Sequence, residues 1–500
     1  MVFMGNEKYP GENEFDEFLS KHGGDNNAYT EQEYTLYHFE IIQEHLREAL
    51  DRMAMFFQNP TLSPNAVERE LSAIESEFQL SKNNDSCRFQ EVLCQTSKDK
   101  HPFSKFSFGN KYSLQERPIS QNINVLQELR NFYEMYYYSS NMRVVVIGAY
   151  TLDELQHLVE TSFKDMPDKP RLDSALNMKR DNPNTWDEIC TSPLEEYGFP
   201  FCKSTSLMKL YKIIPIKDTH SLTLTWQIPP QRNNWKTKPC DVIAHLLGHE
   251  SKGSILSLLK SKHWATSCCA GVGGDGYEDA PSHSLFSITI TLSSDVIQQN
   301  YWIDIVRTIL TYIGMMKYYC KQDDGLPVWI YEELKTIGDL SYKYANEQSP
   351  TDAVESIAET LSPLYNLPPE RILDGNHLLW EFNNEEISSL LCNYFTVDNC
   401  RFTLISSSFK ENEGEELRTE PYFGTKYWVC DISDDDLSSW REALIPVIPS
   451  SESELALPPK NPFVPTNFEL KPFPVDDASH FLMSKSVKLC SIGSDCNVVS

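Results

Sequence analysis

One helical pattern occurs twice along the chain, and this repetition constrains the fold more than any other feature. Ser63-Pro64 predicts the start of the first copy, because a capping hydroxyl followed by proline is favoured at a helix N-terminus. The apolar residues that follow fall on one helical stripe, at Val67, Leu71, Ile74 and Phe78. The segment Glu70-Leu71-Ser72-Ala73-Ile74-Glu75-Ser76-Glu77 aligns with Glu333-Leu334-Lys335-Thr336-Ile337-Gly338-Asp339-Leu340. We therefore expect two related units in series.

The length of 500 residues suggests two or three domains. We expect a first unit over residues 1–185, a second over 195–445, and a proline-rich linker and tail over 446–500. Strand patterns alternate with helical ones along the chain. The predicted strands include 28–30, 35–42, a buried strand at 143–147, and 284–292. The predicted fold class is α/β (α+β): two homologous units, each a mainly antiparallel sheet with packed helices.

Composition and charge exclude several classes of partner. The formal net charge of −28 argues against nucleic acid, which needs a basic surface, and is compatible with basic peptides. No apolar stretch approaches the ~20 residues that span a bilayer, so no membrane partner is expected. The 13 cysteines show no C-x-x-C spacing, which favours free thiols in a reducing compartment and hence a cytoplasmic location.

Two acidic residues and the first residues of the chain carry the chemistry. The run Met1-Val2-Phe3-Met4-Gly5 is typical of the last turn of a helix that is closed by glycine. Glu70 and Glu77 are seven residues apart, about two helical turns, so they lie on the same side of their helix. Spacing alone is more typical of a solvated acidic face than of a site.

Together, these blocks resemble the nardilysin and insulin-degrading enzyme family of inverted zinc peptidases, and the resemblance covers roughly residues 1–475. In that family, the helix that ends in this N-terminal run carries His-x-x-Glu-His, which supplies two zinc ligands and the general base. The resemblance implies that Glu77 is the third Zn²⁺ ligand and that Glu70 supports the ligands without binding the metal itself. The sequence contains no His-x-x-Glu-His, so no catalytic base is retained and we expect neither tight zinc binding nor peptide hydrolysis.

The second unit contains a related but altered motif, His245-Leu246-Leu247-Gly248-His249. It keeps two histidines one helical turn apart but has glycine in place of the base, and Leu340 replaces the third ligand. We therefore expect an inactive copy. Two interpretations of the histidines remain open: a metal clamp, for which no third ligand is indicated, or packing and peptide contact.

The resemblance also implies two surfaces that bind substrate. The edge strand beside the zinc, which pairs with the substrate backbone, corresponds to Asn27, Ala28, Tyr29 and Thr30. A second surface, which holds the N-terminal end of the substrate away from the cut, corresponds to Gly248, His249, Glu250, Ala270 and Gly271. Relatives usually have glycine at the position of Ala270.

The resemblance implies a nardilysin-like zinc metalloendopeptidase that cuts peptides at basic residues, and the missing motif implies that this chain by itself is inactive. The alternative is a non-catalytic fragment that binds peptides or a protein partner. If the protein is a zinc metalloendopeptidase, an incomplete gene sequence would explain the missing motif. Self-association and pairing with a C-terminal half also remain open, because the resemblance implies relatives about twice as long.

Overall fold

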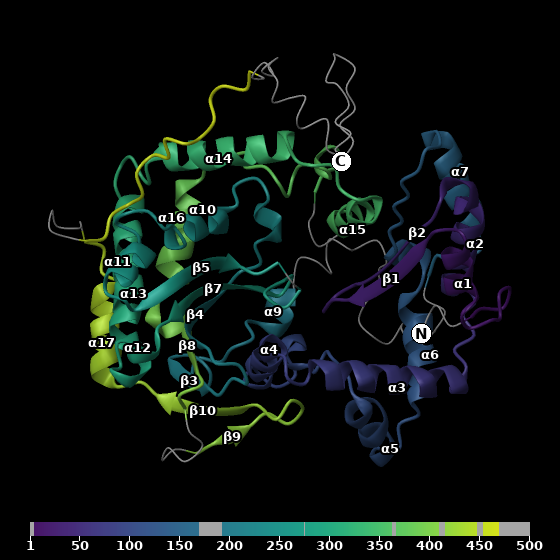
Figure 1. Cartoon of the computed structure of the whole chain (residues 1–500), viewed down its shortest axis with the longest axis horizontal. Helices are drawn as coiled ribbons and strands as arrows, with labels where there is room; N and C mark the ends of the chain where they lie inside the picture. The colour runs from purple at the N-terminus through teal and green to yellow at the C-terminus, as the bar shows by residue number, and fades with distance from the viewer. Residues whose placement is uncertain are drawn as a thin grey trace, which may run out of the picture. The chain divides into compact units, whose positions relative to one another are not determined.

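The computed structural model describes residues 5–169, 193–274, 276–362, 367–409, 416–447 and 454–469 (Figure 1). Residues 1–460 form one compact unit, and residues 461–500 form a second. The described residues 461–469 contain no helix or strand. Met1–Met4, expected to end a helix, and most of the proline-rich tail lie outside the described residues.

The first part of the compact unit consists mainly of helices around one hairpin. Its helices and strands are α1 (Glu14–Lys21), β1 (Asp25–Thr30), β2 (Thr35–Glu40), α2 (Leu46–Gln58), α3 (Pro64–Ser81), α4 (Asp85–Gln95), α5 (Arg117–Ser120), α6 (Val125–Tyr136), α7 (Leu152–Phe163) and α9 (Pro193–Tyr197).

The hairpin of β1 and β2 lies between two layers of helices. On one side, Phe15 and Leu19 of α1 pack against Ala49 and Phe56 of α2. On the other side lies α15 (Pro350–Thr360), which comes from a distant part of the sequence and contacts β2 (Figure 1). The hairpin is therefore positioned by both early and late segments of the chain.

The prediction of a buried strand at 143–147 is wrong. This segment forms neither a strand nor a helix, and the side chains of Val144 and Ile147 are 40% and 46% exposed. A strand needs a neighbour whose backbone groups complete its ladder, and no described strand pairs with these residues. The apolar sequence Arg143-Val144-Val145-Val146-Ile147 indicated β-structure but could not supply that partner.

The second part contains the main sheet and its helices. Its elements are β3 (Lys209–Ile213), β4 (His220–Ile228), α10 (Pro239–Leu247), α11 (Ile255–Ser261), β5 (Ala265–Val272), β6 (Asp279–Ala280), β7 (His283–Leu292), α12 (Ser294–Gln298), α13 (Trp302–Cys320), α14 (Val328–Lys343), α15, α16 (Asn384–Asn393), β8 (Cys400–Ser406), β9 (Arg418–Thr419), β10 (Lys426–Asp431) and α17 (Asp434–Ala443).

The main sheet has the strand order β5-β7-β4-β8-β3-β10-β9, and the short β6 pairs with β7. Its pairs are antiparallel except β3 with β8. Buried and half-buried residues alternate along the second half of β7, as expected for a sheet with one face on a core. The strand β5 is terminal, so only one of its edges pairs within the described sheet.

The main core lies between this sheet and the helices α10, α11, α13, α16 and α17. Trp226 of β4 is fully buried against Phe395, with ring centroids 5.2 Å apart. On α13, Ile305, Ile309 and Ile313 are also fully buried. This core fixes the position of the β5 edge.

The mixed α/β class predicted from the sequence is confirmed. The described residues do not show two homologous units, because the first part has a two-stranded sheet and the second an eight-stranded one. The repeat and the boundaries at 1–185, 195–445 and 446–500 therefore remain predictions. No helix within the described ranges is both long enough and apolar enough to cross a bilayer.

Candidate functional site

The helix α3 carries both glutamates that the sequence singled out. It begins as predicted: the Ser63 hydroxyl accepts a hydrogen bond from the Ala66 amide, 3.2 Å away, and Pro64 is the first residue. Phe78 is buried, but the other three residues of the stripe are only half-buried. The helix therefore packs more loosely than its apolar pattern predicts.

Glu70 is half-buried, whereas Glu77 is exposed to solvent. Within the described ranges, no hydrogen bond or ion pair joins the Glu77 carboxylate to another residue. On the same helix, Glu75 accepts hydrogen bonds from the Lys111 amide at 2.7 Å and from Gln79 at 2.7 Å. The Lys111 bond also lowers the pKa of Glu75.

The residues present do not fit a zinc ion. Among the described residues, no group of three or more His, Cys, Asp and Glu side chains is placed to hold a metal. Glu77 is thus a candidate ligand, but the described residues place no further ligands beside it. Its role as a ligand, and the supporting role of Glu70, remain predictions.

The strand β1 is paired on one side only, with β2. The Glu31 amide donates to the Tyr34 carbonyl at 2.9 Å, which makes these two residues a hydrogen-bonded pair. Bonded and non-bonded pairs alternate along an antiparallel ladder, so the backbone groups of Asn27 and Tyr29 point toward β2. The backbone groups of Ala28 and Thr30 therefore point to the open edge.

This edge can accept an extended peptide. The Ala28 amide bonds only locally in the described structure, to the side-chain oxygen of Asn27 at 2.9 Å. A peptide strand would exchange that contact for a ladder bond. The sequence predicted four binding residues from 27 to 30; the geometry divides them into two whose backbone faces the open edge and two that hold β1 to β2.

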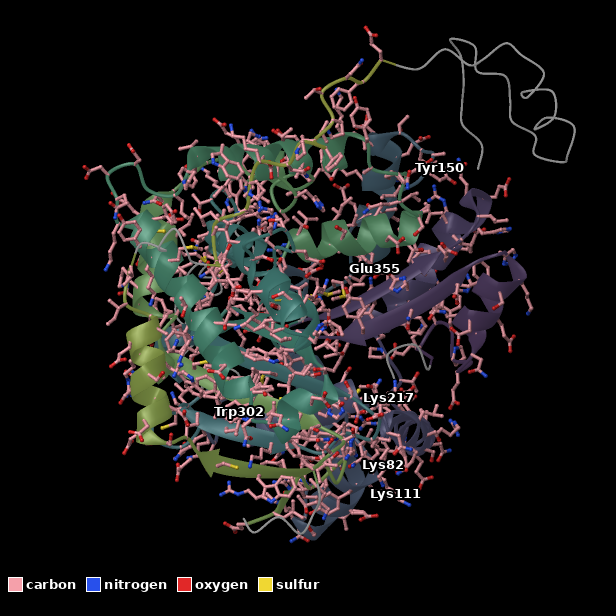
Figure 2. The ribbon with its side chains drawn as sticks, turned by 60° about the vertical axis from the view of Figure 1, so that its left-hand side comes forward. Lys82, Lys111, Tyr150, Lys217, Trp302 and Glu355 are labelled. Carbon is pink, nitrogen blue, oxygen red and sulfur yellow. The ribbon has the colours of Figure 1, made fainter. Side chains whose placement is uncertain are left out.

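Acidic residues surround Tyr29. Partial burial raises the pKa of its phenol, and the charges of Glu359 and Glu355 on α15 raise it further. Glu355 also contacts His38 of β2, with 3.1 Å between Oε1 and Nε2, where α15 meets this strand (Figure 2). A second contact joins the same elements, because the Thr351 hydroxyl donates to Glu40 at 2.8 Å. Sequence reasoning missed α15 entirely.

The residues of the second predicted surface lie at the end of α10 and on β5. A side-chain carbon added to Gly248 would lie 3.7 Å from Ala270, so the helix end rests on β5 where these residues predict. Gly271 has a φ of +155°, a backbone conformation that favours glycine. The structure thus brings Gly248, His249, Ala270 and Gly271 together, and Glu250 lies beside them in an ion pair with Lys260 at 3.5 Å.

His245 and His249 lie one helical turn apart, and among the described residues no third side chain completes a metal-binding group with them. Their ring centroids are 5.1 Å apart in an edge-to-face arrangement. Burial lowers the pKa of both imidazoles, and the charge of Glu333 on α14 opposes that shift in both. In the sequence alignment, Leu340 occupies the position of Glu77, the predicted third ligand. The acid whose charge acts on both histidines is instead Glu333, which aligns with Glu70.

Comparisons with known proteins identify the family of the chain. Three models of one family match in order: "Insulinase (Peptidase family M16)" at residues 1–106, "Peptidase M16 inactive domain" at 124–335, and "Middle or third domain of peptidase_M16" at 342–486.

Curated relatives match nearly the whole chain. A nardilysin-like protein of Arabidopsis thaliana is 35% identical over 472 residues, which cover 94% of this chain and 42% of that protein. Nardilysin of Homo sapiens is 35% identical over 95% of this chain and 38% of its own length. Human insulin-degrading enzyme is 35% identical, with coverages of 94% and 42%. The chain thus spans less than half the length of these relatives.

Solved structures show the same fold. The crystal structure of pitrilysin superposes with a TM-score of 0.77 at 23% identity and covers 94% of this chain and 45% of that one. A Helicobacter pylori protease superposes with a TM-score of 0.56 at 16% identity, with coverages of 81% and 87%. The family models and the curated relatives agree, and from them we conclude that the chain belongs to peptidase family M16, the insulinase family.

Proposed function

We propose that this chain is the nardilysin-like part of a zinc metalloendopeptidase and that these 500 residues alone bind extended peptides without cutting them. The open edge of β1 carries this proposal. Ala28 and Thr30 direct their backbone donors and acceptors away from β2, and no described strand occupies that side. Main-chain pairing provides affinity with modest dependence on sequence, as a peptide-binding site requires.

A preference for basic peptides is supported by charge. Glu355 and Glu359 act electrostatically on Tyr29, which lies in β1 between the two edge-facing residues. The net charge of −28 adds a long-range attraction for cationic peptides. The charges of these carboxylates would favour an arginine or lysine side chain of a bound peptide near Tyr29.

Hydrolysis requires groups that these residues do not supply. In metallopeptidases of this kind, bound zinc polarises the scissile carbonyl and activates water. The sequence lacks the His-x-x-Glu-His segment that would give two ligands and the base, and Glu77 has no ligand partners among the described residues. We therefore assign no catalytic step to this chain.

The direct test is to incubate the purified chain with a fluorescent peptide that contains two adjacent arginines, with added Zn²⁺ and separately with phenanthroline. We expect saturable binding by fluorescence anisotropy in both samples and an intact peptide by mass spectrometry. Cleavage that phenanthroline abolishes and metal restores would overturn the proposed inactivity. Failure to bind any basic peptide would overturn the binding proposal.

The second candidate function is zinc-dependent hydrolysis by a longer product of the same gene. It is favoured by the curated relatives, whose lengths exceed twice that of this chain. This candidate predicts an in-frame His-x-x-Glu-His encoded directly upstream of Met1. Sequencing the 5′ end of the transcript decides between the two.

Cysteines buried in the core, such as Cys240 and Cys400, are free thiols, and we propose a cytoplasmic location on that basis. Fractionation of the source cells would test it. Recovery of the chain from an oxidising compartment with its thiols paired would contradict it.

A further inference from the structure

We propose that Glu31 is a positioning residue that holds the open edge of β1 in place relative to β5, so that one peptide can lie on both. The proposal rests on the peptide binding proposed above and adds a specific coupling between the two edges. Glu31 belongs to neither strand, because it is the first residue after β1.

The contact is direct and sterically tight. The Glu31 carboxylate oxygen Oε2 accepts a hydrogen bond from the Gly276 amide at 3.0 Å. A side-chain carbon added to Gly276 would lie only 2.6 Å from that oxygen and 3.2 Å from the Cβ of Glu31. A larger residue at this position would therefore displace the carboxylate from the amide.

The contact joins two segments that are far apart in the sequence but end beside each other. Gly276 lies four residues after Val272, the last residue of β5. The chain lengths on either side of the bond place Thr30 and Val272 within roughly 25 Å of each other. The neighbouring Glu33 lies within electrostatic reach of Arg232 and Asp279, so the turn of the hairpin meets this region at more than one point.

The other contacts of the hairpin act elsewhere. The contact of His38 with Glu355 and the hydrogen bond from Thr351 to Glu40 attach β2 to α15, on the strand away from the open edge. They hold the hairpin but do not join it to the segment after β5. Glu31 makes that connection directly.

A fixed distance between two weak binding edges changes affinity through effective concentration. A peptide that spans both edges binds the second one intramolecularly, which raises its affinity by about 10²-fold or more when the geometry suits. If the hairpin moves relative to β5, that advantage decreases. Glu31 should therefore influence long peptides and leave short ones unaffected.

The experiment compares two arginine-containing peptides on the full chain by fluorescence anisotropy at fixed ionic strength. The short peptide has 6 residues, the length of β1. The long peptide begins with the same residues and extends to about 24, enough for both strands and a connection of about 8 residues at ~3.3 Å each. The readout is the ratio of the two dissociation constants.

Glu31→Ala should lower the long-to-short advantage about tenfold and leave the short peptide unchanged. Glu31→Gln should keep most of the advantage, because its amide oxygen still accepts from Gly276. Gly276→Ala should reproduce the loss, and the double variant should be no worse than either single one. Glu442→Ala, an exposed glutamate of α17, is the control for lost charge.

The outcomes separate the two proposals. Equal weakening of both peptides by Glu31→Ala, or no weakening of either, overturns the positioning role. Equal affinity of the wild-type chain for both peptides shows that the edges do not act together, which overturns the coupling but leaves peptide binding intact. If neither peptide binds, the proposed function fails and the coupling fails with it.

Discussion

Glu77 illustrates at the residue scale what a sequence pattern can and cannot predict. Its spacing from Glu70 correctly places both on one helix, since α3 runs from Pro64 to Ser81. Its environment could not be predicted, because exposure depends on which distant segments cover the helix. The structure leaves Glu77 in solvent and engages Glu75 instead. The same reasoning explains why Glu31 and Glu355 were missed: their partners lie hundreds of residues away.

A buried acid elsewhere gives a stability prediction. Glu91 of α4 is 5% exposed, and burial raises its pKa from the ordinary value of 4.5 to about 8, with a further increase from the charge of Glu420. The raised folded-state pKa means that the wild-type chain loses stability as pH rises from about 4.5 to about 8. Glu91→Gln should remove this loss and stabilise the protein at pH 7 by up to about 3 kcal/mol.

Urea unfolding of both proteins at several pH values measures the difference. The gain should be largest near pH 8 and vanish near pH 4.5, while Glu160→Gln, at an exposed position of α7, should show no such trend. A variant that is less stable than wild type at pH 7 would show that the ionised carboxylate is the stabilising form.

At the element scale, local signals were sufficient where an element is defined by its own residues. The N-cap of α3 lies where it was predicted, and the strands β1 and β2 overlap the ranges predicted for them. The segment 143–147 shows the opposite case, since a strand exists only when a second strand completes its hydrogen bonds. The contact between α15 and the hairpin likewise depends on residues that are distant in the sequence, so local patterns could not predict it.

The cap of α3 can be tested directly. Ser63→Ala removes the acceptor for the Ala66 amide, and we expect a loss of about 1 kcal/mol in the free energy of unfolding. Ser63→Asp should retain most of the stability, because its carboxylate can accept the same bond. Equal stability of wild type and Ser63→Ala in urea titrations would mean that the described bond contributes nothing.

At the scale of the whole molecule, charge and order along the chain were the informative features. Blocks in the right order predicted the family, which the comparisons confirm over three successive models. The equivalence of two units did not emerge, because the first part forms a two-stranded sheet and the second an eight-stranded one. The number of strands in a sheet depends on pairing between distant segments, which a local sequence repeat cannot predict.

The net charge of −28 gives a kinetic prediction. The association rate of an arginine-rich peptide should fall about tenfold between ~20 mM and ~200 mM salt, because screening weakens long-range attraction. A neutral peptide of equal length should show little change. Stopped-flow fluorescence provides both rates. Identical salt dependence for the two peptides would exclude electrostatic steering.

The central claim is that the open edge of β1 binds peptides through its backbone without zinc, and Ala28→Pro tests it most directly. Proline removes the amide that faces the open edge, and the bonds of β1 to β2 remain, because that amide does not pair with β2. Ala28→Val keeps the amide and serves as the matched control. Thermal unfolding of all three proteins confirms that the fold is retained.

We expect the dissociation constant of a six-residue arginine-containing peptide, measured by anisotropy with phenanthroline present, to rise about tenfold in Ala28→Pro. In Ala28→Val it should remain at the wild-type value. Equal binding by all three folded proteins, or binding that disappears when metal is removed, would contradict the claim.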